Sequence, residues 1–144
     1  MTAKELFLEA MRRSDAGDID GFVELQGPDC TWITPSAELH GREELRGWLA
    51  PWLAGFPTDR HHEISRVVEL DDTVYCEGVF HGVNAGEMNT PEGTLPATGK
   101  TLAMPFAIVV DIDVDAGYAT AVHLYFDQLG FLGQLGLVPA EATA

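Results

Sequence analysis

Residues 101–126, TLAMPFAIVVDIDVDAGYATAVHLYF, contain two alternating segments and one turn signal. Large apolar residues alternate with other residues over 101–113 and again over 118–126, which is the side-chain period of a β-strand. Between the two segments, DAG at 115–117 is typical of a tight turn. The stretch therefore predicts a long antiparallel hairpin.

The part of the chain before this hairpin carries the same period. Residues 61–70 and 73–81 alternate as strands do, with DD at 71–72 as the turn between them. CTWITP at 30–35 is typical of another strand, which its proline ends. The segment 82–100 is rich in turn residues, and a loop of that length in a compact domain is usually functional or mobile. These segments predict an antiparallel meander.

Helical patterns precede the strands. Residues 3–14 place apolar side chains three and four positions apart, which predicts an amphipathic helix. A short second helix should cover Phe22 to about Leu25, with Asp18 or Asp20 as its cap.

A third helix should begin at Arg42, and Pro51 should kink or restart it because proline removes a helix hydrogen bond. A short fourth helix is predicted from about Gln128 to Gly136. Helices followed by an antiparallel meander predict one α+β domain over residues 1–144, in which helices cover one face of a curved sheet.

Charge and composition limit the classes of partner. The formal net charge is −15 and the chain has only eight Lys and Arg residues, which argues against nucleic acid and against an acidic membrane surface. No apolar run approaches the roughly 18 residues that span a bilayer. The first residues lack the apolar region of a signal peptide, so we expect a cytoplasmic protein. Cys30 and Cys76 lie in apolar stretches without metal-ligand spacing, so we expect small buried side chains.

Four short motifs in order resemble one known family. They are GFPTDRHHE at 55–63, GVFHG at 78–82, LPATGK at 95–100, and Asp127 followed by QLG at 134–136. On these motifs and the order of elements, the chain resembles the SnoaL-like polyketide cyclase branch of the nuclear transport factor 2-like superfamily over nearly its whole length.

The resemblance implies a cone-shaped fold in which a bent antiparallel sheet wraps N-terminal helices around an apolar pocket, commonly in a homodimer. It implies ring closure by aldol condensation of a polyketide-like or terpenoid-like substrate without cofactor or metal, with Asp127 at the position of the proton-transfer acid. Two differences stand out. The strand 101–113 lacks the histidine that those cyclases pair with the acid, and His123 replaces their usual aromatic residue.

Alternation gives each strand an apolar face and a titratable face. On the last strand, His123, Tyr125 and Asp127 share the titratable face. On the strand that ends at His81, that face holds Tyr75, Glu77, Val79 and His81. Either the titratable face is solvated and the apolar face packs under the helices, or the titratable face lines the pocket. The match at Asp127 favours the second arrangement.

In that arrangement Asp127 would be the general base and acid, and His81 and His123 would donate hydrogen bonds to the developing enolate. Tyr125 would place the substrate carbonyl, and Glu77 would orient His81. Further candidates for substrate binding are Tyr75, Glu77, Trp32 and Trp48, of which the tryptophans would form a pocket wall for a flat substrate. His61 and His62 should point to opposite faces of their strand, so no metal site is predicted there.

The same arrangement predicts how two copies would associate. The apolar faces of the last two strands would then be buried across a homodimer interface. They carry Val122, Leu124, Phe126, Leu102, Met104, Phe106, Ile108 and Val110.

Two other functions remain open. One is a small-molecule-binding domain without chemistry, which the missing partner histidine favours. The other is an epoxide hydrolase or dehydratase of the same fold, since LYFD at 124–127 resembles the epoxide hydrolase branch. That branch needs an arginine between two acids, and no arginine follows Arg66.

Overall fold

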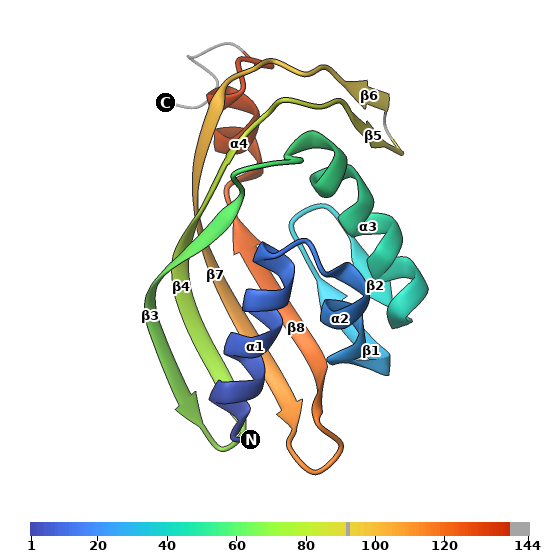
Figure 1. The fold of residues 1–144 in the computed structure, drawn as a ribbon, viewed down its shortest axis with the longest axis vertical. Helices are drawn as coiled ribbons and strands as arrows, with labels where there is room; N and C mark the ends of the chain where they lie inside the picture. The colour runs from blue at the N-terminus through green and yellow to red at the C-terminus, as the bar shows by residue number, and fades with distance from the viewer. Residues whose placement is uncertain (92, 139–144) are drawn as a thin grey trace.

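A computed structural model describes residues 1–91 and 93–138 as a sheet whose one face carries helices (Figure 1). The helices are α1 (Ala3–Asp15), α2 (Ile19–Glu24), α3 (Gly41–Gly55) and α4 (Gln128–Gln134). The strands are β1 (Gln26–Ile33), β2 (Glu38–His40), β3 (His61–Leu70), β4 (Thr73–Val83), β5 (Met88–Thr90), β6 (Gly93–Leu95), β7 (Thr101–Asp113) and β8 (Tyr118–Phe126). The predicted α+β class, with a curled sheet and N-terminal helices, is confirmed.

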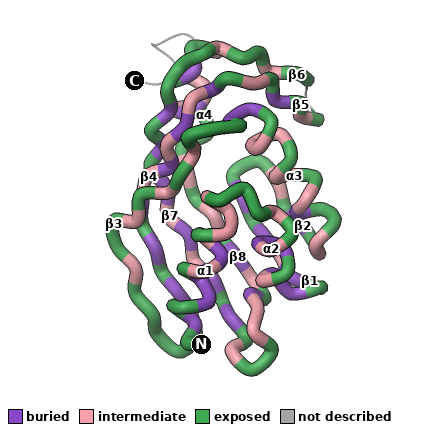
Figure 2. The backbone as a smooth tube through the Cα atoms, viewed as in Figure 1, coloured by how far each residue is buried: buried purple, intermediate pink, exposed green. Residues whose placement is uncertain are grey.

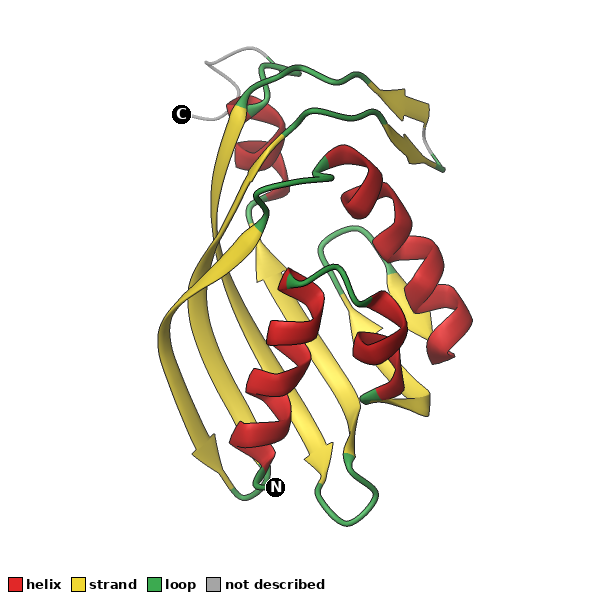
Figure 3. Cartoon of the chain, in the orientation of Figure 1, coloured by secondary structure: helices red, strands yellow, loops and turns green. Residues whose placement is uncertain are grey.

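The main sheet has the strand order β2-β1-β8-β7-β4-β3, and its central pair is the predicted hairpin of β7 and β8. Every neighbouring pair is antiparallel except β1 and β8, which are parallel. Helices α1, α2 and α3 all lie against the same face of this sheet (Figure 3). That arrangement leaves the other face without a covering layer among the described residues.

Local structure departs from the predictions in several places. Strand β1 begins at Gln26 rather than at Cys30, and β2 was not predicted. The 82–100 segment contains the hairpin β5–β6, where the sequence predicts only a loop, because strands of three residues are too short for a periodic signal. Of the two alternatives predicted for Pro51, a restart is excluded because α3 continues through this residue. The second helix begins as predicted behind an aspartate cap, in which Asp18 accepts a hydrogen bond from the Gly21 amide at 2.9 Å.

The helices cover the apolar face of the sheet. This contradicts the prediction that the titratable face lines the pocket. Val122, Leu102 and Val110 are at most 4% exposed beneath them. Buried positions alternate with exposed ones along β4 and β7 (Figure 2). The reason is that α1 and α3 carry apolar stripes of their own, and such stripes are stabilised by packing against apolar rather than titratable side chains.

The packing of the helices on the apolar face removes the basis of the dimer prediction. The apolar band that was expected at a dimer interface lies under the helices, with Met104, Phe106 and Ile108 only 6–7% exposed. The homodimer remains a prediction that the family resemblance supports. None of the described helices is long and apolar enough to cross a membrane.

A buried asparagine joins α3 to the segment after β4. Asn84 is fully buried, and its Nδ2 donates to the carbonyls of Gly55 (3.2 Å) and Gly86 (3.0 Å). Its Oδ1 accepts from the backbone amide and the hydroxyl of Thr98, both at 2.9 Å. Because all four bonds lie in a region of little regular structure, this one side chain fixes the end of α3 against the base of the β5–β6 hairpin.

The two cysteines are buried free thiols, as predicted, each 3% exposed. Burial raises the pKa of both Cys30 and Cys76 to about 11. Because the thiolate is the reactive form, the native protein at pH 8 should react with a disulfide reagent such as DTNB roughly a hundredfold more slowly than the urea-unfolded chain. The reaction should accelerate as the pH approaches 11. Equal rates for native and unfolded protein at pH 8 would contradict this.

Candidate active site

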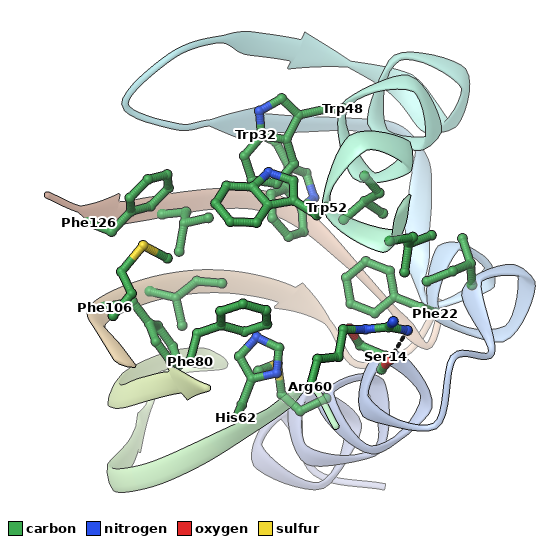
Figure 4. A pocket seen from close by; sticks show the side chains of 17 residues that line it. Ser14, Phe22, Trp32, Trp48, Trp52, Arg60, His62, Phe80, Phe106 and Phe126 are labelled. Carbon is green, nitrogen blue, oxygen red and sulfur yellow. Dashed lines mark hydrogen bonds between the residues drawn. The ribbon is translucent and has the colours of Figure 1, made fainter. Parts of the chain in front are cut away.

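An aromatic cavity of about 100 Å³ lies between the helices and the covered face of the sheet (Figure 4). Strands β4, β7 and β8 provide one wall through Phe80, Met104, Phe106, Ile108, Leu124 and Phe126. Helices α1, α2 and α3 provide the other through Met11, Ser14, Ile19, Phe22, Trp48, Leu49, Trp52 and Leu53. The lining is mostly apolar with a few polar groups, which is typical of a small-molecule pocket.

All three tryptophans of the chain line this cavity. Trp32 and Trp48 have ring centroids 6.4 Å apart, and those of Trp48 and Trp52 are 5.8 Å apart. The Trp32 indole donates to Oε1 of buried Gln26 at 3.1 Å, which fixes its ring. Trp32 and Trp48 thus lie where the sequence predicts a pocket wall, and their binding of substrate remains a prediction.

A histidine and an aspartate form a pair at the edge of the cavity. His62, near the start of β3, lines the cavity, and its Nδ1 lies 2.6 Å from Oδ1 of Asp15, the last residue of α1. Oδ2 of the same carboxylate accepts the backbone amide of His62 at 3.2 Å. The two side chains are 19% and 28% exposed, so the pair is largely shielded from water.

This contact places a hydrogen on one ring nitrogen. A carboxylate only accepts hydrogen bonds, so Nδ1 of His62 carries a hydrogen, and in the neutral form of the ring Nε2 carries the lone pair. Nε2 has no hydrogen-bond partner among the described residues. Every fully buried side-chain nitrogen or oxygen among these residues has a partner, so Nε2 is not fully buried. It therefore keeps accessible surface, and in Figure 4 the ring extends toward the aromatic side chains. Its centroid is 5.1 Å from that of Phe80 and 5.5 Å from that of Phe106.

The position of Asp15 is costly without its partner. A negative charge at the carboxyl end of a helix is disfavoured by the helix dipole, which is itself negative there. The two hydrogen bonds from His62 offset this cost. The arrangement is a carboxylate that orients an imidazole, which is the usual support for a histidine that accepts a proton.

Arg60 is the only Lys or Arg among the described residues that line the cavity. It donates from Nη1 to the Phe56 carbonyl at 2.9 Å. It also donates from Nη2 to the Ser14 carbonyl at 3.3 Å, the bond drawn in Figure 4. It forms no salt bridge with any described carboxylate. The described lining residues include no Asp or Glu, so the arginine between two acids of the epoxide hydrolase branch has no counterpart there.

The predicted place of Asp127 in the cavity is wrong. Asp127 is exposed, does not line the cavity, and accepts the Gly130 amide at 2.8 Å as the cap of α4. Alternation along β8 puts it on the face opposite Leu124 and Phe126, which do line the cavity. Its catalytic role is therefore supported by the family resemblance alone.

The other titratable candidates also lie on the uncovered face. His123 is exposed and bonds the Tyr125 hydroxyl at 2.8 Å, and Tyr125 itself is 54% exposed. Tyr75 is 45% exposed, and Glu77 contacts Arg66 at 3.5 Å. Since the helices pack on the apolar side, none of these side chains lines the cavity, and their predicted place there is wrong.

His81 belongs to a small cluster on that face. Its Nε2 lies 3.1 Å from Glu63, so Glu63 rather than Glu77 is its carboxylate neighbour. Its ring stacks on His61 with centroids 4.9 Å apart. His61 and His62 therefore point to opposite faces, as predicted, and only His62 reaches the cavity. The described residues contain no group of three or more His, Cys, Asp or Glu that could hold a metal ion.

Asp15, Arg60 and His62 were missed by the sequence reasoning, although a signal for His62 was present. On strand 61–70, His62 shares its face with Ile64, so it is a titratable residue on an apolar side. Such a residue is the natural candidate once the apolar faces are taken as the pocket wall. No pattern in the sequence predicts that Asp15 would reach it, because the two lie 47 positions apart.

The fold and the cavity together define an α+β protein in which helices and a curled sheet enclose an apolar pocket of the kind that binds small molecules. A family model described as "SnoaL-like domain" matches residues 6–119. The chain therefore belongs to the SnoaL-like family. A comparison with curated proteins finds no match.

Solved structures of similar fold come from several bacteria. A proposed SnoaL-like polyketide cyclase from Jannaschia sp. CCS1 is 18% identical, with a TM-score of 0.79 and coverage of 95% of this chain and 93% of that one. AclR, a proposed hydroxylase from Streptomyces galilaeus, is 18% identical, with a TM-score of 0.78 and coverage of 95% and 97%. A hypothetical protein of ketosteroid isomerase-like fold from Catenulispora acidiphila DSM 44928, in complex with trimethylamine, is 23% identical, with a TM-score of 0.74 and coverage of 98% of each chain. These likenesses establish the fold.

Proposed function

We propose that this protein is an acid–base enzyme that moves a proton on a small, largely apolar, enolisable molecule held in the aromatic cavity. The observation that carries the proposal is the His62–Asp15 pair, in which a histidine that lines the cavity keeps one ring nitrogen without a hydrogen-bond partner among the described residues. The substrate class is polyketide-like or terpenoid-like, in keeping with neighbours named polyketide cyclases. The proposal keeps the reaction predicted from the sequence and moves it to other residues.

The geometry supports a simple sequence of proton transfers. Nε2 of His62 accepts a proton from the carbon next to a carbonyl group, and the electron pair of that C–H bond becomes the enolate. The carboxylate of Asp15 stabilises the imidazolium that forms, through the hydrogen bond at Nδ1. The enolate carbon can then attack a second carbonyl of the same substrate, which closes a ring, and the imidazolium returns its proton to the new alkoxide. No cofactor is needed for these steps.

An exchange assay tests this without knowledge of the natural substrate. 2-Tetralone is a small bicyclic ketone with acidic protons next to its carbonyl, and their replacement by deuterium in D₂O is visible by NMR. The protein should accelerate this exchange above the rate in buffer at the same pH. Exchange no faster than in buffer, for 2-tetralone and for larger aromatic ketones that bind, would refute the enzyme and favour a binding domain without chemistry.

A pair of aspartate variants distinguishes the two candidate sites. Both Asp15 and Asp127 accept backbone amides near helix ends, so each Asp→Asn change keeps a side chain of the same shape that can still accept. Asp15→Asn should slow exchange by about 10–100-fold, because a hydrogen bond to a charged group contributes about 1.5–3 kcal/mol. Asp127→Asn should leave the rate within about twofold of the original, since that residue lies outside the cavity. The reverse result would restore the assignment made from family resemblance.

A further inference from the structure

Arg60 is a positive charge in an aromatic cavity without a negative partner. Arg60 lines the cavity together with Ser14 and His62, and the described residues place no carboxylate within salt-bridge distance of its guanidinium. Arg60 is partly buried, and a charge that is partly removed from water is generally paired, because desolvation is costly for a charge alone. A ligand in this cavity is therefore in a position to supply the missing negative charge.

The guanidinium is also held in a fixed orientation. Its two bonds go to the carbonyl of Phe56, at the end of α3, and to that of Ser14, near the end of α1. Two of its five N–H groups are used in this way, which leaves donors for a further acceptor. A planar guanidinium that is fixed before binding is suited to a carboxylate or phenolate oxygen, since little side-chain freedom is then lost when the ligand binds.

The net charge of the protein and the tryptophans of the cavity together favour selective binding of an aromatic anion. With a net charge of −15, the protein repels anions in general, so binding of an anion requires a specific local partner. Flat rings are accommodated by the tryptophan wall formed by Trp32, Trp48 and Trp52. We infer that the substrate class of this cavity is an aromatic molecule that carries an anionic oxygen, carboxylate or phenolate, which Arg60 binds. The inference rests on the proposed function, because it names the substrate of the same cavity.

Arg42 provides a matched control that tests whether the role of Arg60 is purely structural. Arg42 donates to the carbonyls of Gln26 at 2.8 Å and Glu24 at 3.3 Å, so it makes the same type of contact as Arg60. Arg42 does not line the cavity. Replacing either arginine by glutamine removes one positive charge and two carbonyl contacts, but only Arg60→Gln removes a charge from the cavity.

The experiment compares two ligands of nearly equal shape, 2-naphthoate and 2-acetonaphthone, which differ by an anionic oxygen against a methyl group. Calorimetry gives their dissociation constants, and the NMR signals of the three indole N–H groups report on the cavity, since every tryptophan of the chain lines it. The protein should bind 2-naphthoate roughly tenfold more tightly than 2-acetonaphthone. Arg60→Gln should abolish the preference, Arg60→Lys should retain part of it, and Arg42→Gln should retain all of it.

Several results would overturn the inference. They are equal affinities of the unaltered protein for the two ligands, no measurable binding of 2-naphthoate, binding that leaves the indole signals unchanged, and a preference that survives Arg60→Gln. If Arg60→Gln does not fold, the unaltered protein and Arg60→Lys still decide between these outcomes. Because binding rather than turnover is measured, a preference for the anion without ketone exchange would refute only the proposed proton transfer. Exchange without that preference would refute only the inference about Arg60.

Discussion

Replacing His62 by glutamine should lower the rate of deuterium exchange in 2-tetralone by roughly two to four orders of magnitude, the usual contribution of one positioned acid–base group. Glutamine retains a side-chain amide that can donate to Asp15, but it has no nitrogen lone pair that accepts a proton near neutral pH. The loss should appear mainly in the rate at saturating ketone, because the aromatic walls that bind the ring are unchanged.

The adjacent histidine provides the control. His61→Gln alters the same residue type one position away, yet His61 stacks on His81 on the opposite face of the sheet. Its exchange rate should match that of the unaltered protein. A His62→Gln protein within a few-fold of the original rate would exclude His62 as the base. If His81→Gln or His123→Gln instead abolished exchange, the titratable face of the sheet would carry the chemistry after all.

Replacing Asn84 by leucine should lower the free energy of unfolding by about 3–5 kcal/mol, which is large for a single substitution. Leucine has a similar size but cannot bond the carbonyls of Gly55 and Gly86 or the amide and hydroxyl of Thr98. A buried polar group that loses its partner costs about 1–3 kcal/mol, and water can reach some of these groups by local rearrangement. Urea unfolding followed by circular dichroism measures the change.

An exposed asparagine serves as the comparison for this prediction. Asn89 lies in β5, and the hydroxyl of Thr94 is its side-chain partner, at 2.8 Å. Asn89→Leu should change the free energy of unfolding by no more than about 1 kcal/mol, because water replaces the lost partner at the surface. Similar losses for both variants would mean that burial of Asn84 does not determine its contribution.

The elements of the fold were largely predictable from the sequence because their signals are local. The limits of β3, β7 and β8 agree with the predicted strands 61–70, 101–113 and 118–126, where alternation is long and turn residues mark the ends. The parallel pairing of β1 with β8 was not predictable in this way. It depends on contacts between residues about 90 positions apart, such as Trp32 and Val122.

The candidate site was predicted less well, because the wrong face of the sheet was taken as the wall of the pocket. Alternation correctly separates Leu124 and Phe126 from His123 and Tyr125, but it does not say which side the helices cover. That question is settled by the packing of α1 and α3, whose apolar stripes select the apolar side. The family resemblance at Asp127 favoured the other side. The titratable candidates were consequently predicted to line the pocket, which they do not, whereas Trp32 and Trp48 do line it.

The pairing of β1 with β8 also affects the order in which the protein can form. Strand β8 lies between β1 and β7, so the β1–β2 hairpin has no sheet to join until residues as far as Phe126 have left the ribosome. Contacts of such large sequence separation slow folding, because a long loop must close before they stabilise anything. Until then the edge of β7 that pairs with β8 has no partner strand, and unpaired strand edges are prone to aggregation. The ligand cavity, which needs β8 as a wall, is therefore among the last features to appear, and a nascent chain that stops before this strand has no binding site.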